Sequence, residues 1–245
     1  MLTARMHTCL NCERPFEGHF CNHCGQKAST HRFTMHEWAH EIPHTLLHVD
    51  GNFVRTMWAL TTRGGDAVRE FLAGKRKSLY PPFVYALLWS GAYVLVSHWL
   101  EAADHQSAFP TDLSEAVAYI QAKYFKVLMV GSILPMALGT TLAFRRAGYN
   151  FAEHLVLNMY LMSQLIIVDT LRQLLLAALG HEHESIVTAI DVCIEYPYWF
   201  WFYWRFFTPE NAVSGAVRGA VAIATSNFAI FALVSLCAGI LVGMH

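Results

Sequence analysis

The sequence predicts an all-α integral membrane protein: a five-helix transmembrane bundle with juxtamembrane amphipathic helices and a small N-terminal zinc ribbon. Of the 245 residues, 55% are hydrophobic and only 14% are charged, whereas a soluble domain carries about 25% charged residues. Long apolar stretches follow one another from residue 81 onward, and two pairs of cysteines precede them. This composition excludes a disordered chain. The net charge of -1 argues against a nucleic-acid partner, because such proteins usually carry a basic surface.

Five stretches are long enough to cross a membrane as helices, which takes roughly 17–25 residues. They are 81–100, 126–144, 153–179, 186–204 and 219–243. Pro81 to Leu100, Val127 to Phe144 and Gly219 to Gly243 contain no Asp, Glu, Lys or Arg. The third and fourth stretches carry charged residues. The fourth also holds a proline before an aromatic run typical of a membrane interface, and the sequence leaves open whether it crosses.

The distribution of basic residues predicts the orientation, because Lys and Arg gather in cytoplasmic loops. With the N-terminus inside, 14 of the 17 Lys and Arg residues lie on the cytoplasmic side. They are the ten up to Lys77, followed by Arg145, Arg146, Arg205 and Arg218. We therefore expect a protein of the cytoplasmic membrane, in contact with the lipid bilayer, with a cytoplasmic N-terminus and its C-terminus outside.

The first 30 residues contain two C-x2-C pairs, formed by Cys9 with Cys12 and by Cys21 with Cys24. Two such turns supply tetrahedral zinc coordination, and Gly25 lets the backbone curl around the second pair. The alternatives are two disulfides, which a reducing cytosol disfavours, and a redox dithiol, which lacks a βαβ context here. Residues 1–30 are therefore expected to be a zinc ribbon with one structural ion, whose closed ligand set leaves no position for a substrate.

Several motifs resemble those of a bacterial membrane family known as domain of unknown function 3667. They are Gly18–Gln26 around the second cysteine pair, Asp50–Thr56, Gly74–Lys77 followed by Pro81-Pro82, and Glu153-His154. Two features depart from the expected pattern: Gly51 directly follows Asp50, and a row of histidines precedes it. The resemblance implies a protein of the bacterial inner membrane with this architecture, and it supplies no catalytic residue.

Residues 31–80 are expected to form the amphipathic helices. Apolar residues at helical spacing predict an apolar face resting on the cytoplasmic leaflet, with Lys75, Arg76 and Lys77 contacting anionic lipid headgroups. A row of histidines covers the opposite face of the first helix: His36, His40, His44 and His48. These histidines are either a solvated face or a second metal or pH-sensing site, since imidazole titrates near neutrality.

Four charged residues fall inside the third and fourth stretches: Asp169, Arg172, Asp191 and Glu195. Each costs roughly 2.5–3.5 kcal/mol at mid-membrane, so we expect them to pair. The short turn between the two stretches makes them antiparallel neighbours, and it brings Arg172 to the depth of Asp191. The cluster is either a polar clasp between helices or a proton, ion or anionic-lipid site. One carboxyl group is expected to be protonated, because one Arg cannot neutralise several acids.

Three functions follow from these features. The first is a non-enzymatic membrane protein whose zinc ribbon and interfacial helices mediate recruitment of a cytoplasmic protein, or regulation. The alternative is an ion-, metal- or anionic-lipid-handling protein that works through the Arg172 cluster, which would require a homo-oligomer. The third is a lipid-active enzyme with Glu153 and His154 as acid and base, although adjacent helical residues point about 100° apart.

Overall fold

The computed structural model describes residues 6–30, 32–34, 52–101, 131–209 and 211–243. Two short strands, β1 (Met6–Thr8) and β2 (Pro15–Glu17), pair antiparallel near the N-terminus. The helices are α2 (Asn52–Arg63), α3 (Gly65–Leu72), α4 (Pro82–Glu101), α6 (Ile133–Ala143), α7 (Phe151–Leu179), α8 (Glu184–Phe207) and α9 (Ala212–Gly243). Two 3-10 turns, η1 (Arg76–Ser78) and η2 (His181–His183), connect them. Most of the described chain is helical, as predicted.

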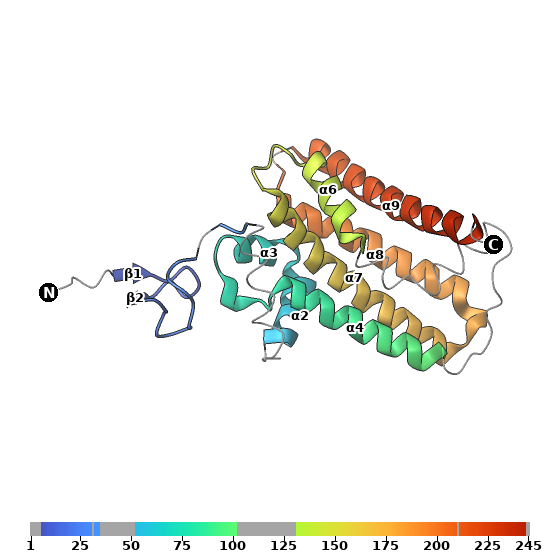
Figure 1. Cartoon of the computed structure of the whole chain (residues 1–245), viewed down its shortest axis with the longest axis horizontal. Helices are drawn as coiled ribbons and strands as arrows, with labels where there is room; N and C mark the ends of the chain where they lie inside the picture. Colours follow the sequence, from blue (N-terminus) through green and yellow to red (C-terminus); the bar gives the residue numbers. More distant parts are fainter. Residues whose placement is uncertain (1–5, 31, 35–51, 102–130, 210, 244–245) are drawn as a thin grey trace.

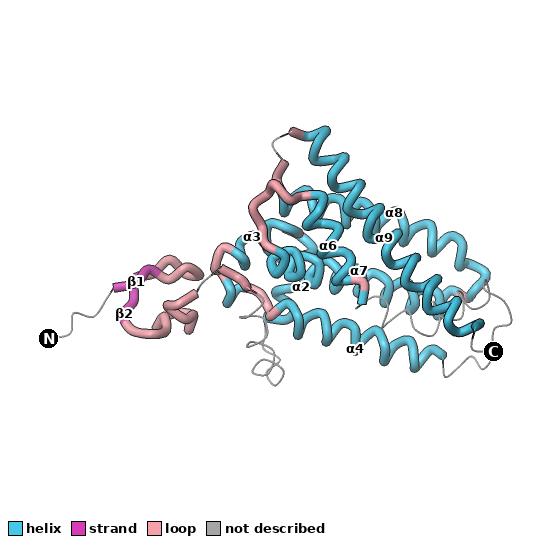
Figure 2. The backbone as a smooth tube through the Cα atoms, turned by 45° about the horizontal axis from the view of Figure 1, so that its top comes forward, coloured by secondary structure: helices cyan, strands magenta, loops and turns pink. Residues whose placement is uncertain are grey.

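Helices α4, α6, α7, α8 and α9 lie side by side, with the β1–β2 unit at one end and the last turn of α9 at the other (Figure 1). Helix α7 is the centre of this bundle, because it contacts α4, α6 and α8, while α9 packs against α6 and α8. The side chains from Ala152 to Ile166 on α7 are all buried. The two strands and their loops form a small unit set apart from the bundle helices, on the side of α3 (Figure 2).

Two helical stretches of the described chain are long and apolar enough to cross a membrane, Arg76–Leu100 and Phe151–Leu179. These stretches support the prediction of a membrane protein. Helices also occur at the other three predicted stretches, as α6, α8 and α9. Their crossing of a membrane, and so the count of five spans, stays a prediction.

The aromatic run near the end of α8 lies partly inside the protein. Trp199, Phe202 and Tyr203 are buried in the core, and a position of the run at a membrane interface stays a prediction. These side chains are buried because α3 packs against this part of α8. Helix α8 also continues through Pro197 to Phe207.

The apolar face of α3 packs against protein rather than lipid, which corrects the prediction made for this helix. Val68, Phe71 and Leu72 are buried between α3 and the bundle helices α7 and α8. The ring of Phe71 meets that of Tyr160 on α7 edge-on, with centroids 5.7 Å apart. An apolar helix face can be buried either against other helices or in lipid. Here the helix bundle buries the apolar face of α3. On α2, Trp58 stays exposed.

The contact between α3 and α8 depends on Gly65. A Cβ atom at this position would overlap the carbonyl oxygen of Phe202 and the amide nitrogen of Phe206, and backbone atoms cannot move aside as a flexible side chain can. We expect Gly65→Ala to lower the free energy of unfolding by about 1–3 kcal/mol. Reversible denaturation in detergent micelles would measure this loss.

Gly91 on α4 offers the matched control for this substitution. No atom of the described residues lies within 4 Å of a Cβ added there. Gly91→Ala should therefore leave stability unchanged or raise it by up to about 1 kcal/mol, because alanine favours a helix. Equal losses for both variants would contradict the close packing at Gly65.

Candidate functional site

The four cysteines come together in the small N-terminal unit. Cys9 and Cys12 lie in the turn after β1, and Cys21 and Cys24 lie in a second turn. The Sγ atoms of Cys9 and Cys24 are 3.4 Å apart, and those of Cys12 and Cys21 are 3.6 Å apart. All four Sγ atoms lie within 4.8 Å of one another. The two pairs therefore interleave around one common point.

This geometry fits a metal ion. Four sulfurs at about 2.3 Å from a tetrahedral ion lie about 3.8 Å from one another, which agrees with the observed separations. Gly25 has a positive φ of 71°, and its amide donates to the carbonyl of Cys21, which closes the second turn. Hydrogen bonds from the backbone of Cys24 and then His23 lower the pKa of the Cys21 thiol, whereas burial and the neighbouring thiols raise the pKa of Cys12. A thiolate is the form that binds a metal.

The four-cysteine unit, which we call the ribbon (residues 6–30), is docked onto the segment between α3 and α4. The buried Gln26 side chain donates its Nε2 hydrogen to the carbonyl oxygen of Gly74, at 2.8 Å. Gly74 has a φ of +113°, and a Cβ there would press on the Leu10 side chain. Glu13 also lies 3.8 Å from the ammonium group of Lys75. The ribbon therefore has a defined place on the rest of the protein.

The basic residues after α3 were predicted to contact lipid headgroups. Lys75 lies 3.8 Å from Glu13 of the ribbon, and the guanidinium of Arg76 lies 5.1 Å from the centre of the Phe33 ring. Lys77 is exposed. A headgroup contact at these three residues stays a prediction.

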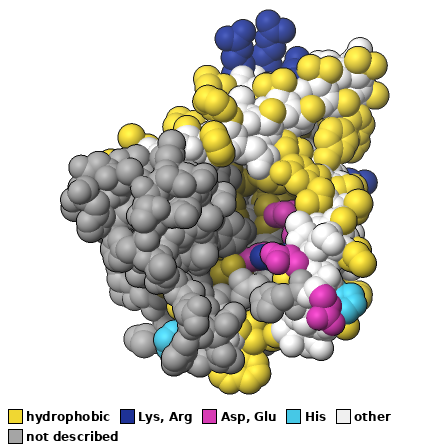
Figure 3. Space-filling view, turned by 90° about the vertical axis from the view of Figure 1, so that its right-hand side faces the viewer, with side chains coloured by type: hydrophobic (Ala, Val, Ile, Leu, Met, Phe, Trp, Pro, Cys, Tyr) yellow, Lys and Arg dark blue, Asp and Glu magenta, His cyan; other side chains and the backbone are white. Residues whose placement is uncertain are grey.

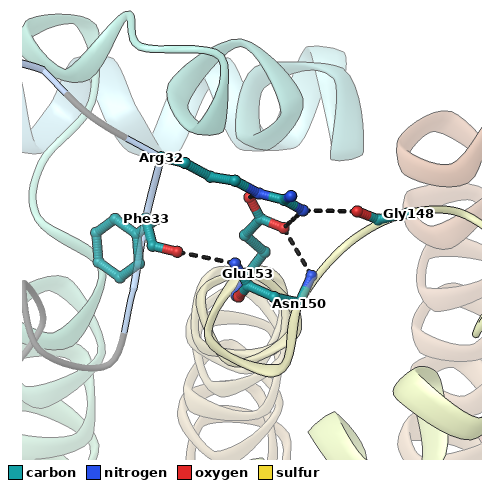
Figure 4. A network of polar contacts seen from close by, with 5 residues as sticks. All are labelled: Arg32, Phe33, Gly148, Asn150 and Glu153. Atoms are coloured by element: carbon teal, nitrogen blue, oxygen red, sulfur yellow. Dashed lines mark hydrogen bonds and ion pairs between the residues drawn. The ribbon is translucent and has the colours of Figure 1, made fainter.

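Arg32 and Phe33, just after the ribbon, tie it to the start of α7 (Figure 4). The Arg32 guanidinium forms a two-pronged pair with the Glu153 carboxylate, with Nε to Oε1 at 2.8 Å and Nη2 to Oε2 at 2.7 Å. Nη2 also donates to the carbonyl of Gly148 at 2.6 Å. The Glu153 carboxylate raises the pKa of Arg32 further. We call this set of contacts the Arg32 anchor.

Residues at the start of α7 hold Glu153 in place and bind the segment that carries Arg32. Asn150 and Glu153 form a capping box, in which each side chain accepts from the backbone amide of the other residue. The Asn150 side chain also donates to the Phe33 carbonyl at 3.0 Å. The ring of Phe33 is buried in the main core beside Phe71. The anchor therefore combines an ion pair, a helix cap and a buried ring.

Glu153 and His154 do not act as a pair in this arrangement. Glu153 is engaged by Arg32 and by the Asn150 amide, whereas Nδ1 of the fully buried His154 lies 3.1 Å from the hydroxyl of Thr140. Thr140 also accepts from Asn158, which in turn accepts from Tyr203 at 2.6 Å. These contacts hold α6, α7 and α8 together, and they give no support to a shared acid–base role.

The structure brings three of the four predicted intramembrane charges into one cluster. Nε of Arg172 donates to Oδ1 of Asp169 at 2.7 Å and lies 3.7 Å from Oδ2 of Asp191 on α8. Glu195, one turn along α8, forms no hydrogen bond or ion pair within the part of the chain that the structure describes. Its carboxyl group still interacts electrostatically with the other three residues.

The predicted histidine row cannot be placed in the same way. His36, His40, His44 and His48 lie outside the residues that the structure describes.

Comparison with known proteins supports one relationship. Residues 50–94 match the family model described as "Protein of unknown function (DUF3667)". The predicted resemblance to DUF3667 is confirmed. No curated protein and no solved structure matches the chain.

The DUF3667 segment contains α2, α3, η1 and the first part of α4. It therefore includes Gly65, which α8 packs against, and Gly74, which receives the ribbon. The matched segment is the connection between the ribbon and the bundle.

Sequence reasoning missed the Arg32 anchor. One signal was available, because Asn150-x-x-Glu153 is a helix-start pattern whose carboxylate would attract a cation. Nothing in the sequence tells which of the many basic residues that cation is. The Thr140–Asn158–Tyr203 contacts were missed for a similar reason, since polar residues scattered over three helices show no pattern until the helices are packed.

Proposed function

We propose that this protein is a non-enzymatic membrane protein whose zinc ribbon is held at the cytoplasmic end of a helical bundle and recruits a soluble partner. The single observation that carries this proposal is the Arg32 anchor. A flexibly tethered ribbon would need no two-pronged pair to Glu153 and no buried Phe33, but both are present. A fixed ribbon presents one defined face to the cytoplasm.

Zinc is the ion that best suits the ribbon, because four cysteine thiolates with two-residue spacing are its usual structural ligands. The ribbon has a hollow lined by His7, His19, Phe20 and Lys27. Phe20 is 57% exposed. An exposed aromatic ring beside polar groups is a common anchor in protein interfaces, and it supports recruitment through this face.

The bundle would sit in the bacterial inner membrane with the ribbon inside. The excess of Lys and Arg at the ribbon end supports this orientation. The C-terminal end of α9 would then lie on the outer side, because α9 runs away from the ribbon (Figure 1).

A photo-crosslinking amino acid at position 20 tests the proposal in living cells. We expect it to form an adduct with one soluble protein, and the adduct should disappear when Cys9 and Cys12 are replaced by Ser. The control carries the crosslinker at Trp58, an exposed aromatic residue outside the ribbon, where no such adduct is expected. An adduct that survives loss of the cysteines, or no adduct at position 20, would overturn the recruitment function.

A further inference from the structure

The Arg172 cluster holds more negative than positive charge. Among the described residues, two aspartates lie within 4 Å of one guanidinium and a glutamate lies one turn further along α8. These residues lie in the half of the bundle away from the ribbon. Asp169 and Arg172 belong to α7, and Asp191 and Glu195 belong to α8. With all three acids ionised, the cluster would carry a net charge of about -2 in a region of low dielectric constant, which is costly. It therefore requires a further cation.

A metal ion does not suit this arrangement. Within the described residues, the only group of three or more His, Cys, Asp or Glu side chains whose ligand atoms converge is the four-cysteine site. Hard cations such as Mg²⁺ and Ca²⁺ need six or more oxygen ligands. A proton needs only one oxygen, so it is the cation that the geometry favours.

Asp169 provides an independent sign of an incompletely satisfied site. It is only 8% exposed, and its Oδ1 atom accepts from Arg172. Its Oδ2 atom is buried and has no hydrogen-bond partner among the described residues, although Tyr93 of α4 interacts with this carboxyl group. A buried acceptor without a donor costs about 1–3 kcal/mol, so the fully ionised cluster is incompletely stabilised.

Arg172 decides which acid takes the proton. Its guanidinium lies within 4 Å of carboxylate oxygens of Asp169 and Asp191, and it stabilises their ionised forms. Glu195 has no such partner among the described residues, and the carboxyl group of Asp191 lies one turn before it on the same helix. From α4, Tyr93 faces Asp169, and the only charged residue of α9 is Arg218 near its start.

We propose that the cluster is an intramembrane proton-binding site, in which Glu195 carries an exchangeable proton. Protons would arrive from the side away from the ribbon. Acidic and basic side chains lie together in a hollow of the face that looks toward this end of the molecule (Figure 3). The side chains of Arg172 and Asp191 are partly exposed, so protons can exchange between the cluster and the solvent.

Infrared spectroscopy of the full-length protein in lipid nanodiscs tests this proposal, because a protonated carboxyl group has a C=O band separate from that of carboxylate. At about pH 7, where a free glutamate is ionised, we expect this band in the unmodified protein, with a shift in D2O. Glu195→Gln should abolish it. The matched control, Glu184→Gln, removes an exposed acid at the start of the same helix and should leave it intact.

Three results would overturn the proposal: no protonated-carboxyl band in the unmodified protein, a band that persists in Glu195→Gln, or a band that Na⁺ or Mg²⁺ removes at constant pH. The last result would show that the site takes a metal cation. The first result needs no variant, so the test does not depend on whether a substituted protein folds. Arg172→Gln should strengthen the band, because the aspartates lose their cation, and an unchanged band would contradict the role given to Arg172.

Discussion

Cys21→Ser is expected to release the metal and unfold the ribbon while the helical bundle stays folded. The buried apolar side chains of the ribbon are only Cys9, Phe16 and Cys21, a core too small to hold 25 residues in place. Structural zinc contributes about 10–16 kcal/mol in small ribbons of this kind. Loss of one of four ligands should therefore remove most of the stability of the unit, and a strong chelator should have the same effect on the unmodified protein.

Zinc per chain, measured by inductively coupled plasma mass spectrometry, and limited proteolysis of the ribbon would report the two effects. We expect one zinc per chain in the unmodified protein and none in the variant, with rapid cleavage within residues 6–30. Cys193→Ser is the control, because Cys193 is an exposed free cysteine on α8, outside the ribbon. One zinc retained by Cys21→Ser, with the ribbon still resistant to protease, would show that the four cysteines are not the ligand set.

The cysteine cluster was predictable because its geometry is local. Two-residue spacing fixes each pair of thiols in one turn, and only one loop separates the turns, so few arrangements of four sulfurs remain. The start of α7 could be predicted in the same way, since its capping box lies within four residues. Features that depend on contacts over a few residues can be derived from the sequence with elementary stereochemistry.

The surface that covers an apolar stripe could not be predicted in the same way. The pattern of Val68, Phe71 and Leu72 defines which face of α3 is apolar, but lipid and a helix bundle solvate that face equally well. The deciding information is the close approach of Gly65 to the backbone of α8, a contact across more than 130 positions of the sequence. Two adjacent glycines at the start of a helix hint at such an approach, yet they do not identify the partner.

The Arg172 cluster was predicted only in part, so it falls between the local features and the contacts between distant segments. Counting residues from the turn between α7 and α8 places Arg172 at the depth of Asp191, and in the structure these side chains lie 3.7 Å apart. The same count pairs Asp169 with Glu195, but no contact between them is found among the described residues. Depth follows from helix rise, whereas the direction of each side chain depends on how the helices rotate against each other.

Arg32→Ala should destabilise the junction between ribbon and bundle by about 2–3 kcal/mol. The Glu153 side chain is only 4% exposed. Once the guanidinium is removed, its carboxylate keeps the backbone amide of Asn150 as its hydrogen-bond donor among the described residues. Hydrogen bonds to charged groups contribute about 1.5–3 kcal/mol. Because the Arg32 side chain is 58% exposed, solvent screens the pair, and the loss should stay below the 3–5 kcal/mol typical of a fully buried one. Reversible unfolding in detergent micelles would measure the loss.

Two comparisons separate the anchor from an ordinary surface pair. Arg63→Ala breaks a pair with Glu70 in which both side chains are well exposed, so its effect should be within about 1 kcal/mol. Glu153→Gln should cost less than Arg32→Ala, because the freed Arg32 is solvated while the amide oxygen still accepts from Asn150. Arg32→Lys should restore only part of the stability, since an ammonium group cannot engage both carboxylate oxygens as the planar guanidinium does. Equal effects of Arg32→Ala and Arg63→Ala would mean that the ribbon is held by Phe33 and Gln26 rather than by the ion pair.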